Sequence, residues 1–183
     1  MIALIVAALV LVLVLALVRS RKRPLVPLMV VATVCTSILG GASIPMMIVD
    51  RPAWHSIGAV AYTEYARATD FERARFIYIP LAWGGAFLVS AALVMARRSR
   101  ADRRVQISLA IATASAWSVL AMTAGAAPNL LRALASPHDE AVLAPLLARF
   151  VAWSIARAAF LVATFWAMLS ALAMQTIRRQ VTA

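Results

Sequence analysis

The sequence predicts an all-α, polytopic membrane protein that forms a single domain over residues 1–183. The expected architecture is a four-helix transmembrane bundle with an additional span at its N-terminus. Of the 183 residues, 64% are hydrophobic and 14% are charged, whereas a soluble domain carries about 45–50% apolar and roughly 25% charged residues. A chain this apolar has no water-facing surface for a phosphate-binding stripe, so its net charge of +11 does not indicate nucleic-acid binding.

Five runs of the sequence are long and apolar enough to span a membrane, since a helix crosses the hydrocarbon core with about 20 apolar residues. They are residues 1–18, 25–49, 76–96, 105–127 and 150–174. The first run is followed rather than preceded by basic residues, which distinguishes it from a secretory signal. The last run is interrupted by a single charge, Arg157.

The basic residues predict the topology. Of the 18 Lys and Arg residues, 11 lie in segments 19–23, 97–104 and 178–179. Because cytoplasmic loops concentrate Lys and Arg, we expect these segments inside a cell membrane, with the N-terminus outside and the C-terminus in the cytoplasm. Six of the seven carboxylates and both histidines lie in segments 50–75 and 128–149. We therefore expect any polar chemistry at the outer end.

The first outer segment is expected to form a short amphipathic helix at the outer face. Trp54, Ile57, Ala61 and Tyr65 recur at helical spacing and predict its apolar face. Asp50 is the expected cap of this helix, because a short polar side chain satisfies the first free N–H groups.

Other local signals predict helix ends and contacts. Residues 69–72 have the pattern of a capping box that starts the third span. Residues 127–129 include a proline that is expected to end the fourth span, and residues 136–139 are expected to begin the next helix. The pairs Gly40-Gly41 and Gly84-Gly85 predict close approach between helices.

Arg157 is the first candidate site residue. It lies about two turns into the last span, where a charge costs about 2.5–3.5 kcal/mol on insertion scales unless it faces protein or water. Its expected partners are Glu64, Asp50 or Glu72 of the first outer segment, and Trp153 shares its helix face. Alternatively, Arg157 extends to the outer interface and only anchors the helix.

The metal-ligating side chains are too few and too scattered to predict a metal centre. His55 and His138 lie on separate segments without the spacing of a zinc or di-iron set. Met46 and Met47 near His55 make only a weak copper set. A haem held by the two histidines is a second weak alternative. We therefore expect no resident cofactor.

Four segments together resemble the anthrone oxygenase-like family of small four-helix membrane proteins. They are Gly40-Gly41-Ala42-Ser43-Ile44-Pro45, the aromatic-rich residues 52–65, Ala127-Pro128-Asn129-Leu130-Leu131 and Trp153-Ser154-Ile155-Ala156-Arg157. The resemblance covers residues 25–174 and leaves the first span as an addition. Asn129 and Arg157 match the family's motifs, whereas Ser154 stands where the family has histidine or asparagine.

The resemblance implies an oxygenase of natural-product biosynthesis. Such an enzyme oxidises an activated aromatic or polyketide-like carbon with molecular oxygen as co-substrate, and needs no obligatory metal or flavin. Its lipophilic substrate would enter from the bilayer. The implied site contains Arg157 and Asn129 around a phenolate or enolate oxygen, Glu64 or His55 as the base, and Trp54, Tyr65, Trp153 and Asp50 around the substrate.

Two other functions fit the same residues. The first is a cofactor-free membrane cyclase or isomerase that acts on a polyketide or terpenoid with the same acid and base groups. The second is a non-catalytic membrane assembly partner, for which Arg157 and the outer helices form an interaction surface. The oligomeric state and the identity of the substrate stay open.

Overall fold

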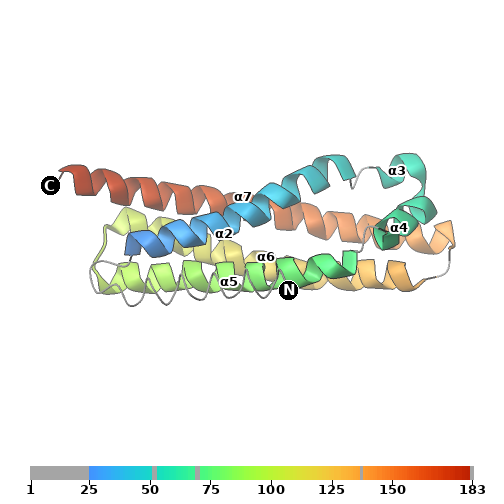
Figure 1. Ribbon diagram of the computed structural model, residues 1–183, viewed down its shortest axis with the longest axis horizontal. Coiled ribbons are helices and arrows are strands. Elements are labelled where there is room, and N and C mark those ends of the chain that lie inside the picture. Colours follow the sequence, from blue (N-terminus) through green and yellow to red (C-terminus); the bar gives the residue numbers. More distant parts are fainter. Residues whose placement is uncertain (1–24, 51–52, 69–70, 137, 182–183) are drawn as a thin grey trace.

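The computed structural model describes residues 25–50, 53–68, 71–136 and 138–181, with only the backbone for 49–50, 71–76 and 178–181. All secondary structure in this part of the chain is helical (Figure 1). The elements are α2 (Leu25–Pro45), the π-helix η1 (Met46–Asp50), α3 (Trp54–Ile57), α4 (Ala59–Ala68), α5 (Phe71–Arg98), α6 (Arg103–Ala135) and α7 (Glu140–Val181). The span expected at residues 1–18 lies outside the described residues.

Four helical segments are long and apolar enough to cross a membrane. They are Leu25–Ile48, Ile77–Arg98, Arg103–Ala135 and Glu140–Ile177. These segments contain the predicted spans 25–49, 76–96, 105–127 and 150–174, apart from one residue at each of two ends. The predicted all-helical fold is therefore confirmed for this part of the chain, and four of its helices are suited to cross a membrane.

The four long helices lie side by side around one apolar interior (Figure 1). Helices α2 and α6 each pack against both α5 and α7, so α5 and α7 lie diagonally across the interior. Met29, Val89, Leu109 and Met168 come from the four different helices, and each has 0% of its surface exposed. Burial of these side chains orders the helices relative to one another.

Helices α6 and α7 extend well beyond the thickness of a membrane. They contain 33 and 42 residues and are therefore about 50 and 63 Å long, against about 30 Å for the hydrocarbon core. The prediction that residues 127–129 end the fourth span is wrong, because α6 continues through Pro128 to Ala135. A proline removes one helix hydrogen bond, and the burial of Leu130 and Ala133 beyond it keeps the helix folded.

The two ends of the molecule differ in structure. At the basic end, a short connection joins α5 to α6, and Arg97, Arg98 and Arg103 lie around it. At the opposite end, which we call the cap end, α4 packs against the connected ends of α6 and α7, and α3 packs against α4 (Figure 1). The cap end has its own apolar core, which consists of Ala59, Tyr62, Ala133, Leu143 and Leu147.

The helix predicted over residues 54–65 is broken in two. Gly58 has φ +88°, a conformation that side chains disfavour, and it separates α3 from α4. The cap position of α3 is held by Ala53 rather than by Asp50. The predicted apolar face is also wrong, because Ile57 and Tyr65 are exposed. The buried residues of α4 are Ala59, Tyr62, Thr63 and Ala66.

The start of α7 confirms the helix start predicted at residues 136–139. The helix begins at Glu140, and a carboxylate oxygen of Asp139 accepts a hydrogen bond from the backbone N–H of Ala141 at 2.9 Å. Leu143 and Leu147 then place an apolar face on the cap-end core. The capping box expected at 69–72 falls partly outside the described residues, and α5 begins at Phe71.

The paired glycines behave differently from the prediction. A methyl group at Gly85 would lie in ordinary contact with Thr36, 3.8 Å from its Cγ2 atom. A methyl group at Gly40, Gly41 or Gly84 would meet no described atom within 4 Å. Gly85 therefore lies at a helix contact, and the other three do not.

Candidate functional site

The candidate site is marked by buried polar atoms that lack partners. Within the described residues, four buried side-chain atoms have no hydrogen-bond partner: Nε of Arg157, Oγ of Ser154, Nε1 of Trp54 and Oε1 of Gln175. Buried polar groups are normally hydrogen-bonded, so such atoms indicate a place where water, an ion or a ligand binds. Arg157 and Ser154 are three residues apart on α7 and share one helix face.

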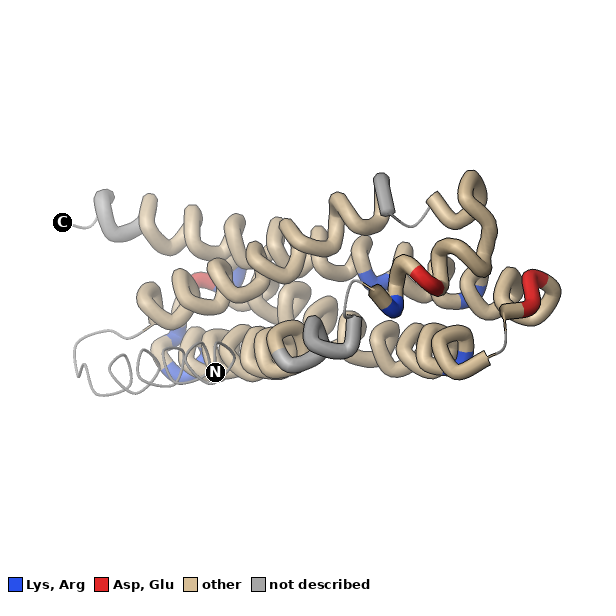
Figure 2. Tube along the Cα trace, turned by 45° about the vertical axis from the view of Figure 1, so that its right-hand side comes forward, with Lys and Arg blue, Asp and Glu red and all other residues tan. Residues whose placement is uncertain are grey.

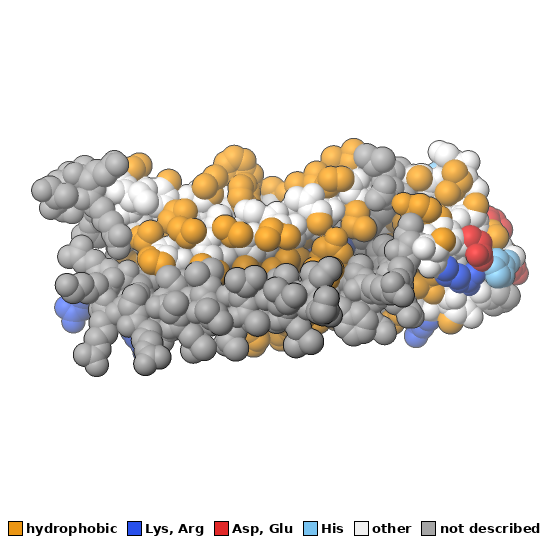
Figure 3. Space-filling view, in the orientation of Figure 1, with side chains coloured by type: hydrophobic (Ala, Val, Ile, Leu, Met, Phe, Trp, Pro, Cys, Tyr) orange, Lys and Arg blue, Asp and Glu red, His pale blue; other side chains and the backbone are white. Residues whose placement is uncertain are grey.

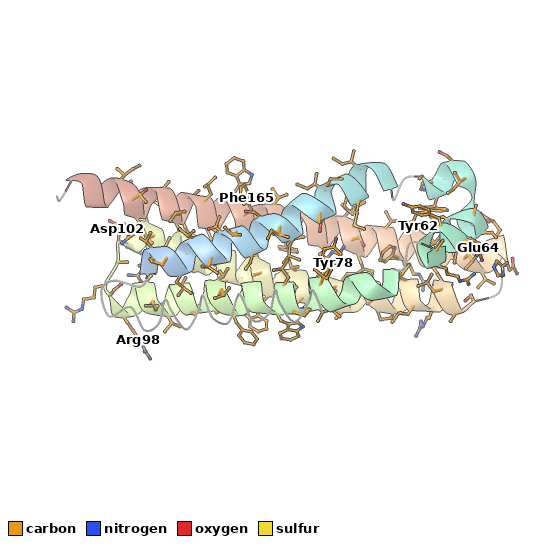
Figure 4. The ribbon with its side chains drawn as sticks, in the orientation of Figure 1. Tyr62, Glu64, Tyr78, Arg98, Asp102 and Phe165 are labelled. Carbon is orange, nitrogen blue, oxygen red and sulfur yellow. The ribbon has the colours of Figure 1, made fainter. Side chains whose placement is uncertain are left out.

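Arg157 faces the interior between the helices. The phenol of Tyr78, on α5, lies within electrostatic reach of its guanidinium group. Because α5 and α7 lie diagonally across the interior, both side chains must point inward to approach each other. Figure 4 shows Tyr78 between the long helices, well away from Glu64 at the cap end.

Arg157 and Tyr78 also lie at the same depth. About 20 residues of helix cross the hydrocarbon core. Counted from Ile177 at the basic end of α7, this length reaches Arg157, and counted from Arg98 of α5 it reaches Tyr78. The two side chains therefore lie at the same level of the bundle, about 20 residues from its basic end.

Trp153 of α7 packs against Gly125 of α6. Its indole ring covers Gly125, where a methyl group would lie only 2.8 Å from the ring. Since α6 and α7 are antiparallel, this contact places Arg157 near the level of Ala121 on α6. Trp153 thus fixes the register of the helix that carries Arg157.

Asn129 is not brought to Arg157. Its side-chain amide donates to the backbone oxygen of Gly125 at 2.8 Å. Asn129 lies eight residues from Ala121, which corresponds to about 12 Å along the helix. The pairing of Asn129 with Arg157 around one oxygen is therefore not part of the arrangement.

Glu64 lies in an ion cluster at the cap end instead of near Arg157. Its Oε1 atom pairs with Nη1 of Arg67 at 2.5 Å and also contacts Nε2 of His138. Arg67 further donates from Nη2 to the backbone oxygen of Leu134 at 2.7 Å. The cluster therefore ties α4 to the end of α6 and to the turn before α7, and Figure 3 shows it on the surface.

The electrostatics of this cluster set the charge of Glu64. Hydrogen bonding from His138, supported by Arg67, holds the pKa of the Glu64 carboxyl below its usual value. A guanidinium group only donates and a carboxylate only accepts. The Nε2–H of His138 therefore donates to Glu64. Arg67 and His138 lie 3.0 Å apart because both donate to the same carboxylate. Glu64 is therefore an anion that is already paired with His138 and Arg67 at the cap end.

Of the remaining candidates, His55, Trp54 and Tyr65 lie at the cap end, and Asp50 has only its backbone described. The ring of His55 stacks on Trp54 with centroids 3.8 Å apart, and His55 is exposed. The ring of Tyr65 lies 6.4 Å from that of Tyr62, and half of Tyr65 is exposed. The side chain of Asp50 lies outside the described residues. The structure thus separates the candidates into a cap-end group and a site around Arg157.

Three functional contacts were not predicted. Glu140 accepts hydrogen bonds from the backbone N–H groups of Ala59 at 2.8 Å and Val60 at 3.2 Å, and so caps α4 from a distant helix. Arg67 covers the end of α6. Tyr78 faces Arg157. Only Arg67 had a signal in the sequence, since it follows Glu64 at the spacing of a helical ion pair.

No metal centre is formed in the described part of the chain. No three His, Cys, Asp or Glu side chains gather there closely enough to hold an ion. Cys35 is buried in α2 as a free thiol. The chemistry available around Arg157 is therefore that of hydrogen-bond donors: a guanidinium, a hydroxyl and a phenol.

No protein-family model, curated protein or solved structure matches this chain. The resemblance to anthrone oxygenase-like proteins therefore stays a prediction.

Proposed function

We propose that this protein is a membrane-embedded oxygenase that oxidises an activated aromatic or polyketide-like carbon of a lipophilic substrate. The observation that supports this proposal is the unpartnered, buried Nε of Arg157 beside the unpartnered hydroxyl of Ser154. Donors held without a partner in a buried position stabilise an oxygen that becomes anionic during a reaction. An anthrone-type substrate develops its charge on such an oxygen.

The geometry reassigns the roles within the proposed mechanism. Arg157 and Ser154 bind the enolate oxygen and favour loss of the proton from the substrate carbon to water, because the predicted bases Glu64 and His55 lie at the cap end. The electron-rich enolate carbon then reacts with dioxygen. One oxygen atom stays on the carbon as a carbonyl, and the other leaves as water with the two hydrogens of the methylene group.

Oxygen uptake with anthrone as the substrate tests this function. The purified protein is reconstituted in liposomes, and the uncatalysed oxidation of anthrone is subtracted. We expect Arg157→Ala to lower the rate by about 100-fold or more, the usual effect of removing an oxyanion donor. Arg149→Ala is the matched control, because Arg149 is exposed on the same helix. Full activity of Arg157→Ala would refute the proposal.

The same assay separates oxygenation from the cyclase or isomerase alternative. An oxygenase forms no product from its substrate under argon, whereas a cyclase or isomerase works at an unchanged rate. A wild-type protein that neither consumes oxygen nor converts the substrate supports the role of a non-catalytic assembly partner.

We also propose a topology for the transmembrane bundle. The basic end faces the cytoplasm, because Arg97, Arg98, Arg100, Arg103 and Arg104 gather there and positively charged loops stay inside. The cap end is then outside. Residues 1–18 form a fifth span that places the N-terminus outside as well. Figure 2 shows the charged residues of α5 and α6 at the basic end.

Thiol labelling tests this topology, because Cys35 is the single cysteine of the chain and is buried. In a Cys35→Ser background, a membrane-impermeant maleimide should label Ala135→Cys in intact cells. It should label Ser99→Cys only after the cells are permeabilised. The reverse pattern would contradict the proposed orientation.

A further inference from the structure

Among the described residues, Gly40 is a buried position with open space where a side chain would begin. Gly40 is buried in α2, yet a methyl group added to it would meet no described atom within 4 Å. Protein interiors are normally close-packed, so a buried position with room for a further group is exceptional. The neighbouring Gly41 also has free space, but it is exposed on the outside of the same helix.

Gly40 lies close to the depth of Arg157 and Tyr78. A Cβ added at Gly85 of α5 would contact Cys35 and Thr36 of α2. The two helices are antiparallel neighbours, so Gly40, four residues beyond Thr36, lies about four residues before Gly85 on α5, between that contact and Tyr78. The space at Gly40 and the donors of α7 therefore lie in the same part of the interior.

Among the described side chains, those around this space supply donors but no negative charge. Each carboxylate whose side chain is described has a partner at one end of the molecule. Glu64 binds His138 and Arg67, Glu140 caps α4, Asp139 caps α7 and Asp102 caps α6. A cation that is partly buried is stabilised by a counter-charge. Within the described residues, none faces Arg157.

We infer that the space beside Gly40 holds the narrow apolar body of an amphiphile whose anionic oxygen, a carboxylate or phenolate, binds Arg157 and Ser154. This inference rests on the site of the proposed function and names its ligand class. The anion supplies the missing counter-charge and accepts from both unpartnered groups. The head then lies at the level of Arg157, and the body lies in the space beside Gly40. Two kinds of molecule carry this chemistry: a flat aromatic acid and a fatty acid.

Binding of anthracene-2-carboxylate tests the inference without requiring turnover. Its fluorescence anisotropy is measured with the full-length protein in detergent micelles, and the neutral amide of the same ring is the ligand control. We expect Arg157→Ala to weaken binding of the carboxylate by about 10- to 100-fold, the range for a charged hydrogen bond. Weak binding of the amide to the wild-type protein is also expected. Dodecanoate is then added as a competitor: efficient displacement identifies a fatty-acid ligand, and poor displacement identifies a flat aromatic one.

Gly40→Val and Gly41→Val form a matched pair that tests the position of the ligand. Both changes introduce the same side chain at adjacent positions where an added Cβ meets no described atom within 4 Å, and wild-type circular dichroism is the check that both variants fold. Gly40→Val should lower the affinity for the carboxylate at least tenfold, and Gly41→Val should leave it unchanged. The smaller Gly40→Ala covers the case in which valine disturbs folding, and it should show an intermediate loss.

Two results would overturn the inference. Equal binding by the wild-type protein and Gly40→Val would show that the space at Gly40 does not hold the ligand. Failure of both acids to bind the wild-type protein would show that Arg157 is not an anion site. A protein that binds the acids as expected but consumes no oxygen refutes only the proposed oxygenase, so the two proposals fail separately.

Discussion

The contact between Trp153 and Gly125 gives the sharpest prediction for stability. A methyl group at Gly125 would lie 2.8–2.9 Å from three carbon atoms of the indole ring, which is closer than non-bonded carbons approach. Gly125→Ala must therefore displace Trp153 or separate α6 from α7. Overpacking of this kind costs about 1–3 kcal/mol. Substitution of glycine by alanine also changes helix propensity, which complicates the effect of the single change.

A double-mutant cycle isolates the steric part. The change in helix propensity occurs both in the wild-type protein and in the Trp153→Ala background, so it cancels in the coupling free energy. We expect a coupling of about 1–3 kcal/mol between Gly125→Ala and Trp153→Ala, with the clash relieved in the double variant. Unfolding by SDS in mixed micelles, followed by circular dichroism, measures it. A coupling below about 0.5 kcal/mol would refute the proposed packing, because distant sites are additive within that limit.

Two further predictions concern the cap end. Glu140→Gln should weaken the cap of α4 by about 1 kcal/mol, because a neutral amide is a poorer acceptor; faster hydrogen exchange at Ala59 and Val60, with unchanged exchange in α6, would verify it. The lowered pKa of Glu64 means that its ion cluster stabilises the fold above the pKa of the unfolded carboxyl. This contribution should disappear as the pH falls through the lowered pKa. The protection factors of the α4 amides, which are corrected for the slower intrinsic exchange in acid, should therefore fall in acid for the wild-type protein, and they should not fall in Glu64→Gln if the cluster is the cause.

The sequence predicted the parts of the fold that depend on local hydrophobicity. The spans at 25–49, 76–96, 105–127 and 150–174 correspond to four helices, because length and apolar composition decide whether a segment spans the hydrocarbon. Helix ends were predicted less well. Pro128 does not stop α6, because packing of the following turns against α7 outweighs one lost hydrogen bond.

The candidate site was predicted only in part. Arg157 was identified because a charge within an apolar run is costly and needs a reason. Its neighbours depend on how the helices are arranged. Tyr78 comes from the diagonal helix α5. Gly40 could be recognised as part of the site only from the open space beside it in the structure. Glu64 was expected at Arg157 and lies at the cap end, because the turn before α7 brings His138 to it.

The hydrogen bonds from Ala59 and Val60 to Glu140 also constrain the order in which the protein matures. Ala59 and Glu140 are 81 residues apart in the chain, and chains generally fold from the N-terminus during synthesis. The first turn of α4 therefore has to wait for its acceptor until the last long helix has been made. The cap end therefore forms late in folding. It forms only after α7 has packed beside the earlier helices.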